Sequence, residues 1–148
     1  MTIWHLLHIA GFTLWLGGGL ACMLIGIRSR SEDRATQGVL VQYLARVHRT
    51  NMLPGIVFTL ASGIALSIPA AKAGAPTAWL MLMQICGVIA AILVLFVSLP
   101  NLSRLTRIKS TGDTAPLFDA LRKRVAMSGA IAGVLGLLAM LGGVLHKY

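Results

Sequence analysis

The side chains of this sequence with the widest chemical repertoire are its four histidines, two of which lie in an apolar run near the N-terminus. His5 and His8 are three residues apart, so on a helix both imidazoles point to one side, about one turn apart. His146 lies near the other end of the chain, and His48 lies between apolar runs. Neutral imidazole binds haem iron and transition metals, and an ionisable side chain within a membrane helix is a functional hypothesis by default. The histidines are therefore the first candidates for a cofactor site.

The elements that must position these histidines are long apolar helices. Of the 148 residues, 57% are hydrophobic and only 11% are charged, whereas a soluble domain usually carries about a quarter charged residues. A spanning helix needs roughly 20 mostly apolar residues. Four segments meet this requirement and contain no Asp, Glu, Lys or Arg: residues 3–27, 52–71, 77–100 and 125–144. The sequence therefore predicts an all-α integral membrane protein, a single domain over residues 1–148 with four transmembrane helices in an up-and-down bundle.

The basic residues predict which way the helices cross the membrane. Lys and Arg number 13 against four Asp and Glu, a formal net charge of +9. Five of the basic residues lie in the loop expected at 28–51 and six in the loop expected at 101–124, while only Lys72 and Lys147 lie on the other side. By the positive-inside rule both loops are cytoplasmic, and both termini lie outside the inner (plasma) membrane of a bacterial-type cell. Topology and the lipid bilayer thus explain the basic charge, and no nucleic acid is expected as a partner.

The two long loops are expected to be partly helical. Apolar residues recur at helical spacing between positions 39 and 47, so the second helix is expected to begin before the membrane. Pro54 lacks a backbone donor and is expected to kink that helix. In the second loop, Thr114 is expected to cap a short helix that starts near Pro116. Cys22 and Cys86 lie in apolar runs without a C-x-x-C pair and are expected to be reduced.

Glycine and aromatic residues indicate which helix faces meet, because small residues let helices approach closely in lipid. One face of the first helix is expected to carry residues spaced by three and four: His5, His8, Phe12, Trp15, Gly19, Cys22 and Gly26. The fourth helix carries Gly129 and Gly133 in a G-x-x-x-G spacing. These glycines predict close packing of the helices, and a homodimer through the glycine-rich faces is a further possibility.

Three interpretations of the outer histidines remain open from the residues alone. In the first, His5 and His146 lie among the lipid headgroups and His8 bonds a carbonyl or Gln84, which lies at a similar depth on the third helix. In the second, His8 binds haem, with His5 or His146 as second ligand. In the third, the three histidines and nearby methionines bind copper. The spans contain no carboxylate, and the sequence has no phosphate-binding glycine loop and no G-x-S-x-G, which argues against a proton-coupled exporter, a nucleotide enzyme and a hydrolase.

The run that begins at His8 resembles the opening helix of a group of small four-helix membrane proteins. The group comprises HemJ-type protoporphyrinogen oxidases, the membrane domain of CopD-type copper-resistance proteins and relatives of the DUF2269 type. The shared pattern is a helical His, a Trp seven residues later and then small residues, here His8, Trp15 and the glycines that follow. The segment 49–63 is also similar to the HemJ pattern, in its Pro54, Thr59 and Gly63.

This resemblance implies haem b held by His8, with Trp15 and Gly19 in the pocket wall, and in the HemJ type oxidation of a porphyrinogen ring. The HemJ type carries a functional Lys early in helix three, whereas residues 79–86 here contain Gln84 and no Lys. We therefore expect a haem b-binding membrane protein with an electron-transfer or haem-linked redox role and an unidentified redox partner. The alternatives are a copper-handling membrane protein and a structural or assembly protein without a cofactor.

Overall fold

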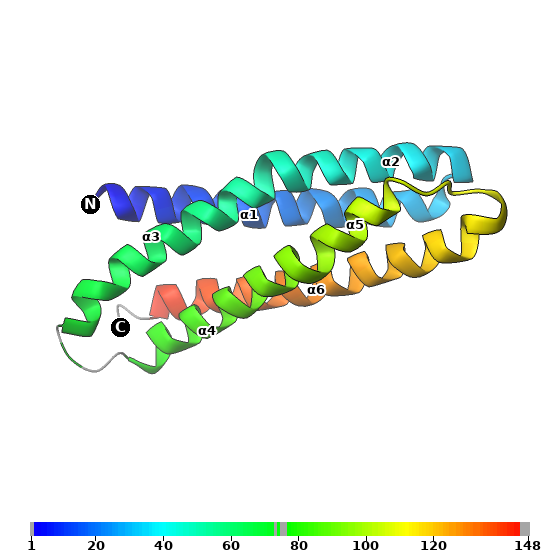
Figure 1. The fold of residues 1–148 in the computed structure, drawn as a ribbon. Coiled ribbons are helices and arrows are strands. Elements are labelled where there is room, and N and C mark those ends of the chain that lie inside the picture. Colours follow the sequence, from blue (N-terminus) through cyan, green and yellow to red (C-terminus); the bar gives the residue numbers. More distant parts are fainter. Residues whose placement is uncertain (1, 73, 75–76, 146–148) are drawn as a thin grey trace.

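The computed structural model describes residues 2–72, 74 and 77–145, which form four long helical rods (Figure 1). The first rod is α1 (Ile3–Arg28), which ends in the 3-10 turn η1 (Ser29–Ser31). The second consists of α2 (Arg34–Val47), the π-helical turn η2 (His48–Met52) and α3 (Leu53–Lys72). The third consists of α4 (Ala78–Ile92), the π-helical segment η3 (Leu93–Ser98) and α5 (Leu99–Leu105). The fourth is the 3-10 turn η4 (Gly112–Thr114) followed by α6 (Ala115–Leu145).

Each rod contains a helix long and apolar enough to cross a membrane. The expectation of an all-α chain with four such helices is therefore confirmed for the described residues. Successive rods run in opposite directions, so the start of α1, the end of α3, the start of α4 and the end of α6 lie at one end of the bundle (Figure 1). We call this the terminal end, and the end that carries the other two connections the basic end.

The segments 28–51 and 101–124, expected as loops, are mostly helical. The second rod begins at Arg34, which confirms that the second helix starts well before residue 52. The expectation of a separate short helix near Pro116 is wrong, because α6 runs without a break from Ala115 to Leu145. Pro116 lies in the first turn of α6, where its missing N–H removes no helical bond. The Thr114 hydroxyl donates to the Lys109 carbonyl, 2.7 Å away, and so closes the preceding loop rather than capping a short helix.

Both π-helical segments come just before a proline. η2 ends two residues before Pro54, and η3 ends two residues before Pro100. A proline inside a helix removes one hydrogen bond, and its ring collides with the carbonyl four residues earlier. A wider turn relieves this collision, and the helix bends there. The second rod changes direction between α2 and α3, so the kink expected at Pro54 is present and coincides with a π-helical turn (Figure 1).

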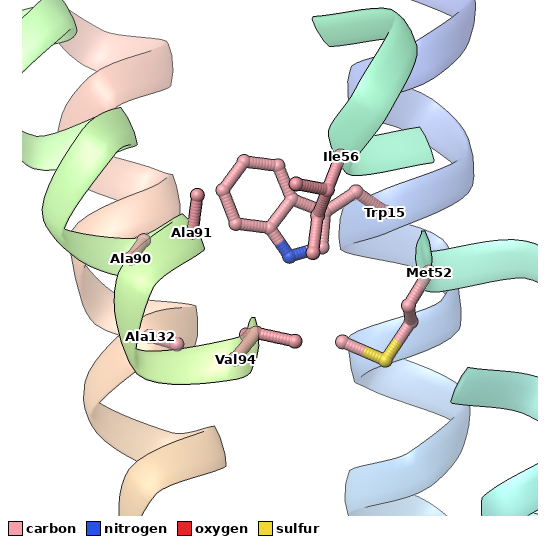
Figure 2. Close-up of a cluster of buried hydrophobic side chains, with 7 residues drawn as sticks. All are labelled: Trp15, Met52, Ile56, Ala90, Ala91, Val94 and Ala132. Atoms are coloured by element: carbon pink, nitrogen blue, oxygen red, sulfur yellow. The ribbon is translucent and has the colours of Figure 1, made fainter. Parts of the chain in front are cut away.

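The rods pack as two pairs. α1 packs along α3 and α4 packs along α6, whereas α3 and α4 make few contacts (Figure 1). Trp15 joins the pairs, because its indole extends from α1 toward Ala91 of α4, beside Ile56 of α3 (Figure 2). Trp15 is only 6% exposed. The small side chains of Ala90, Ala91 and Ala132 leave the space that this large ring fills.

A second core lies toward the basic end, where α2, α5 and α6 meet. Its buried side chains are Val41, Leu44, Leu102, Leu105, Phe118 and Leu121. Arg34 at the start of α2 donates two hydrogen bonds to Asp119 of α6, of 2.6 and 2.9 Å. This fork-shaped ion pair joins the second rod to the fourth outside the apolar core.

The glycines that bring α1 against its neighbour are Gly11 and Gly18, and not Gly19 and Gly26 of the expected stripe. A Cβ on Gly18 would lie 2.7 Å from Met52 Cγ, whereas a Cβ on Gly19 would come no closer than 3.9 Å to Met52 Cε. Gly11 and Gly18 are buried, so the face of α1 is displaced by one position from the expected stripe at these residues. α1 is apolar on all sides, and its periodicity therefore does not distinguish two adjacent faces.

The expectation for α6 is also corrected. A Cβ on Gly129 or Gly133 would meet nothing within 4 Å among the described residues, so the G-x-x-x-G pair does not pack against the other rods. Gly142 makes the close approach instead, because its Cβ would lie 2.7 Å from the Trp79 carbonyl oxygen. α6 and α4 therefore approach each other closely near the terminal end.

Candidate functional site

His8 lies on the side of α1 that faces α3, and its side chain is half-buried. Three residues further along α1, Gly11 brings the two backbones together, since a Cβ on Gly11 would lie 2.8 Å from the Thr59 backbone nitrogen. This crossing brings the imidazole within hydrogen-bonding distance of α3. His8 Nδ1 lies 3.0 Å from the Thr59 carbonyl oxygen and 3.1 Å from Ser62 Oγ.

These contacts assign the tautomer of His8. A carbonyl oxygen only accepts hydrogen bonds, so Nδ1 carries the hydrogen and donates it to Thr59. The Ser62 hydroxyl donates to the Phe58 carbonyl, which leaves its oxygen as a second acceptor beside Nδ1. Nε2 then carries the lone pair, and none of the described residues hydrogen-bonds to it. A metal-binding histidine has this arrangement, with one nitrogen donating to a carbonyl and the other free to bind the metal.

Gly63 provides the space in which the imidazole lies. A Cβ on Gly63 would be 3.3 Å from His8 Cε1 and 3.6 Å from His8 Nδ1. The backbone at Gly63 is ordinary helix, so the space and not the backbone conformation requires a glycine here. A large side chain at this position would push the imidazole away from α3.

Gln84 of α4 is bonded to the same part of α3. Its Nε2 donates to Ser67 Oγ at 2.8 Å, and the Ser67 hydroxyl donates to the Gly63 carbonyl at 2.7 Å. Of the two partners considered for His8, a carbonyl and Gln84, the structure has the carbonyl. The Gln84–Ser67 bond instead connects the two helix pairs at a level where α3 and α4 otherwise make few contacts.

Of the other expected ligands, His5 has a different hydrogen-bond partner from His8. The side chain of His5 is exposed, and its Nδ1 lies 2.7 Å from Thr2 Oγ1. His146 lies outside the described residues. Within the described part of the chain, no group of three or more His, Cys, Asp or Glu side chains is placed to hold a metal ion.

Trp15 and Gly19 lie farther along α1 toward the basic end. Seven residues separate His8 from Trp15, about 10 Å along a helix axis. Phe12 lies between them and contacts Trp15 edge-on, with ring centroids 6.4 Å apart. Trp15 belongs to a cluster of buried side chains, and Gly19 lies one turn beyond Trp15 on α1, away from His8. Trp15 therefore closes the interior on the side of His8 that faces the basic end.

His48 lies in a different environment. It is 5% exposed in η2, and its Nδ1 lies 3.1 Å from the Leu44 carbonyl and 3.4 Å from Cys22 Sγ. Cys22 follows His8 by fourteen residues on α1, about 21 Å along the axis. The structure thus keeps His48 apart from His5 and His8, as the sequence predicts. Cys22 and Cys86 are both free thiols.

Sequence reasoning selected His8 as a candidate but did not predict which residues orient it. Thr59, Ser62 and Gly63 lie within little more than one turn of α3; the first two lie within hydrogen-bonding distance of His8 Nδ1, and the third leaves space beside the ring. A signal was present, because hydroxyl and glycine residues at spacings of three and four interrupt an apolar helix. The sequence did not show which helix His8 faces.

No family model, curated protein or solved structure matches this chain. The chemistry of the site is therefore that of its own residues. These are one imidazole with an available Nε2, a carbonyl and a hydroxyl that orient it, and a glycine that makes room for it.

Proposed function

We propose that this chain is a multi-pass protein of a bacterial-type inner membrane that binds haem b through His8 Nε2 and has an electron-transfer or haem-linked redox role. The hydrogen bond from His8 Nδ1 to the Thr59 carbonyl carries the proposal, because it leaves Nε2 as the metal-binding nitrogen. The resemblance of the His8-to-Trp15 run to the HemJ type favours the same ligand. Bound haem would supply one-electron chemistry through its ferric and ferrous states.

The residues around His8 have distinct roles in this proposal. Thr59 orients the imidazole and makes Nε2 more basic through the hydrogen bond at Nδ1. Gly63 keeps the ring against α3, and Trp15 excludes water from the direction of the basic end. A second histidine that could hold the iron would be His5 or His146.

The outward-facing side chains support insertion into a membrane. Exposed large apolar residues extend along the third rod from Trp79 to Phe96 and along α6 from Met127 to Val144. Each stretch covers seventeen residue steps, about 26 Å at 1.5 Å per residue, which is near the hydrocarbon thickness of about 30 Å. Soluble monomers rarely expose apolar surface so extensively. The excess of Arg and Lys at the basic end favours an orientation with that end in the cytoplasm and both termini outside.

Absorption spectra of the full chain test the haem assignment. The protein would be produced with ample haem supply and purified in detergent, with iron and copper measured on the same samples. We expect a Soret band in wild-type protein, its loss in His8→Ala, and its retention in His48→Ala, because His48 lies about 21 Å away along the bundle. A colourless wild-type protein, or a full Soret band in His8→Ala, would refute the haem assignment. A colourless protein with stoichiometric copper would favour the copper alternative.

A second variant tests the geometry without removing the ligand. Gly63→Leu should displace the His8 ring from Thr59 and reduce haem content, since a Cβ at position 63 already lies 3.3 Å from His8 Cε1. Gly129→Leu is the matched control, because a Cβ there meets nothing described within 4 Å. Equal haem content in the two variants would contradict the assigned position of the imidazole.

The spin state of the iron identifies the second ligand. A low-spin spectrum indicates two strong axial ligands, and a high-spin spectrum indicates one. We expect His5→Ala to retain haem, because the exposed His5 is already bonded to Thr2 and does not hold the site together. Conversion from low to high spin in His5→Ala or in His146→Ala would identify which histidine completes the coordination.

A further inference from the structure

A groove of about 500 Å³ follows the second rod from α2 into η2, at the basic end of the bundle. Its polar lining consists of Gln42, Tyr43, Arg46, Arg49 and Thr50. Arg46 and Arg49 are exposed and three residues apart, so their guanidinium groups extend from the same side of the rod about one turn apart. The Tyr43 side chain is also exposed and lies one turn before Arg46. The groove therefore presents several hydrogen-bond donors and two positive charges.

The positive charge of this groove is not neutralised by the described residues. Acidic side chains pair with other arginines: Glu32 lies 3.0 Å from Arg28, and Asp119 binds Arg34. None of the described residues forms an ion pair with Arg46 or Arg49, and none that lines the groove carries a carboxylate. An anion from outside the chain would therefore meet two unpaired guanidinium groups.

The position of the groove relative to the membrane indicates where that anion would be found. This step rests on the proposed membrane insertion. The apolar segment of the second rod begins at Met52. Arg49 and Arg46 precede it by three and six residues, about 5 and 9 Å along a helix axis. The headgroup layer of a bilayer extends for a similar distance beyond its hydrocarbon core. The two arginines thus lie at the level of the phosphates of the cytoplasmic leaflet.

We propose that this groove binds the phosphate of an anionic phospholipid of the cytoplasmic leaflet. Guanidinium groups bind phosphate oxygens through paired hydrogen bonds, and the Tyr43 hydroxyl is an additional donor. The rod continues into α3 with exposed apolar side chains, Val57 and Phe58, which suit contact with acyl chains. This continuity of a cationic groove with apolar surface favours a lipid over a water-soluble phosphate compound.

Lipid binding by the full chain in a neutral detergent tests the site, with native mass spectrometry to measure bound lipid at increasing concentrations. The probes are a phosphatidylglycerol, a phosphatidylcholine with the same acyl chains, and inorganic phosphate. The test variant is Arg46→Gln with Arg49→Gln. The control is Arg104→Gln with Arg107→Gln, an exposed pair with the same spacing at the end of α5 and in the turn that follows, outside the groove. A hydrogen bond to a charged group typically strengthens binding by about tenfold or more, so we expect the test variant to bind phosphatidylglycerol at least about tenfold more weakly.

The proposal predicts that wild-type protein and the control variant bind phosphatidylglycerol more tightly than phosphatidylcholine, and that only the test variant loses this preference. An equal loss in both variants, or none in either, would refute a specific site. Displacement of phosphatidylglycerol by millimolar inorganic phosphate would also overturn the lipid assignment. Membrane insertion is measured separately, as resistance of the protein to alkaline extraction from membranes, and it should be the same in all variants. Extraction of wild-type protein would refute insertion itself.

Discussion

Gly11 of α1 and Gly55 of α3 cross with their backbones in contact. A Cβ on Gly55 would lie 2.7 Å from the Gly11 carbonyl oxygen, and a Cβ on Gly11 would lie 2.9 Å from the Gly55 carbonyl oxygen. In lipid, the hydrophobic effect does not drive helices together, so close packing of this kind is what holds them in contact. The crossing lies one turn from His8, so it also determines how near His8 Nδ1 lies to Thr59.

Enlarging this crossing should destabilise the bundle. Gly55→Val would place side-chain atoms where the α1 backbone lies, and overpacking of this kind typically costs about 1–3 kcal/mol. We expect a lower melting temperature in detergent, measured by circular dichroism. Gly133→Val is the matched control and should melt like wild type, because a Cβ at position 133 contacts nothing described within 4 Å. Unchanged melting of Gly55→Val would contradict the close crossing.

A buried pair of serines offers a second test. Ser98 Oγ and Ser128 Oγ lie 2.7 Å apart between η3 and α6, and both residues are buried. The Ser128 hydroxyl donates to the Arg124 carbonyl, so the Ser98 hydroxyl donates to Ser128. Ser128→Ala leaves the Ser98 hydroxyl without this acceptor, which should cost about 1–3 kcal/mol.

Removing both hydroxyls should cost less than the sum of the single changes, because Ser98→Ala in the Ser128→Ala background also removes the unsatisfied group. A double-mutant cycle by thermal or chemical unfolding in detergent measures this coupling. Additive effects of the two substitutions would show that the hydroxyls do not interact.

The start of α2 should loosen in acid. The Asp33 side chain accepts hydrogen bonds from the Thr36 backbone N–H and from the Thr36 hydroxyl, and these bonds lower the pKa of the Asp33 carboxyl. Because the folded-state pKa lies below the unfolded value, the carboxylate contributes its full stability above the ordinary pKa of about 3.9. The contribution is lost as the pH falls through the lower, folded-state pKa.

Hydrogen exchange at the Thr36 amide, measured at several pH values, detects this loss. Asp33→Asn is the reference at each pH, because asparagine also caps helices but does not titrate. We expect protection in wild-type protein, relative to this variant, to fall below about pH 4. If the ratio of Thr36 amide protection between wild-type protein and Asp33→Asn does not vary with pH, the role of the charged cap is refuted.

Reporter fusions test the orientation in the membrane. With five and six basic residues in the two segments at the basic end, we expect a fusion after Tyr148 to lie outside the cytoplasm. A phosphatase that requires export should therefore be active there, and green fluorescent protein should not be fluorescent. A bright fluorescent fusion would reverse the orientation and place the His8 site at the cytoplasmic face.

The sequence by itself determined the helices of this protein. Apolar segments of about 20 residues without charges have few ways to satisfy their backbone polar groups other than as helices, and the four expected helices are present. The apolar periodicity between 39 and 47 also showed that the second helix starts early, and Leu44 of this segment is buried. These properties are local, because they depend on residues within a few turns of one another.

Only the tertiary structure decided which faces meet. On helices that are apolar all round, the sequence pattern does not distinguish Gly18 from Gly19, and the contact of Gly18 with Met52 depends on the register between α1 and the second rod. The tautomer of His8 was likewise undetermined, because its acceptor is a carbonyl 51 residues away. Backbone carbonyls are identical at every residue of a sequence, so only the packing of α1 on α3 could select Thr59 and leave Nε2 free.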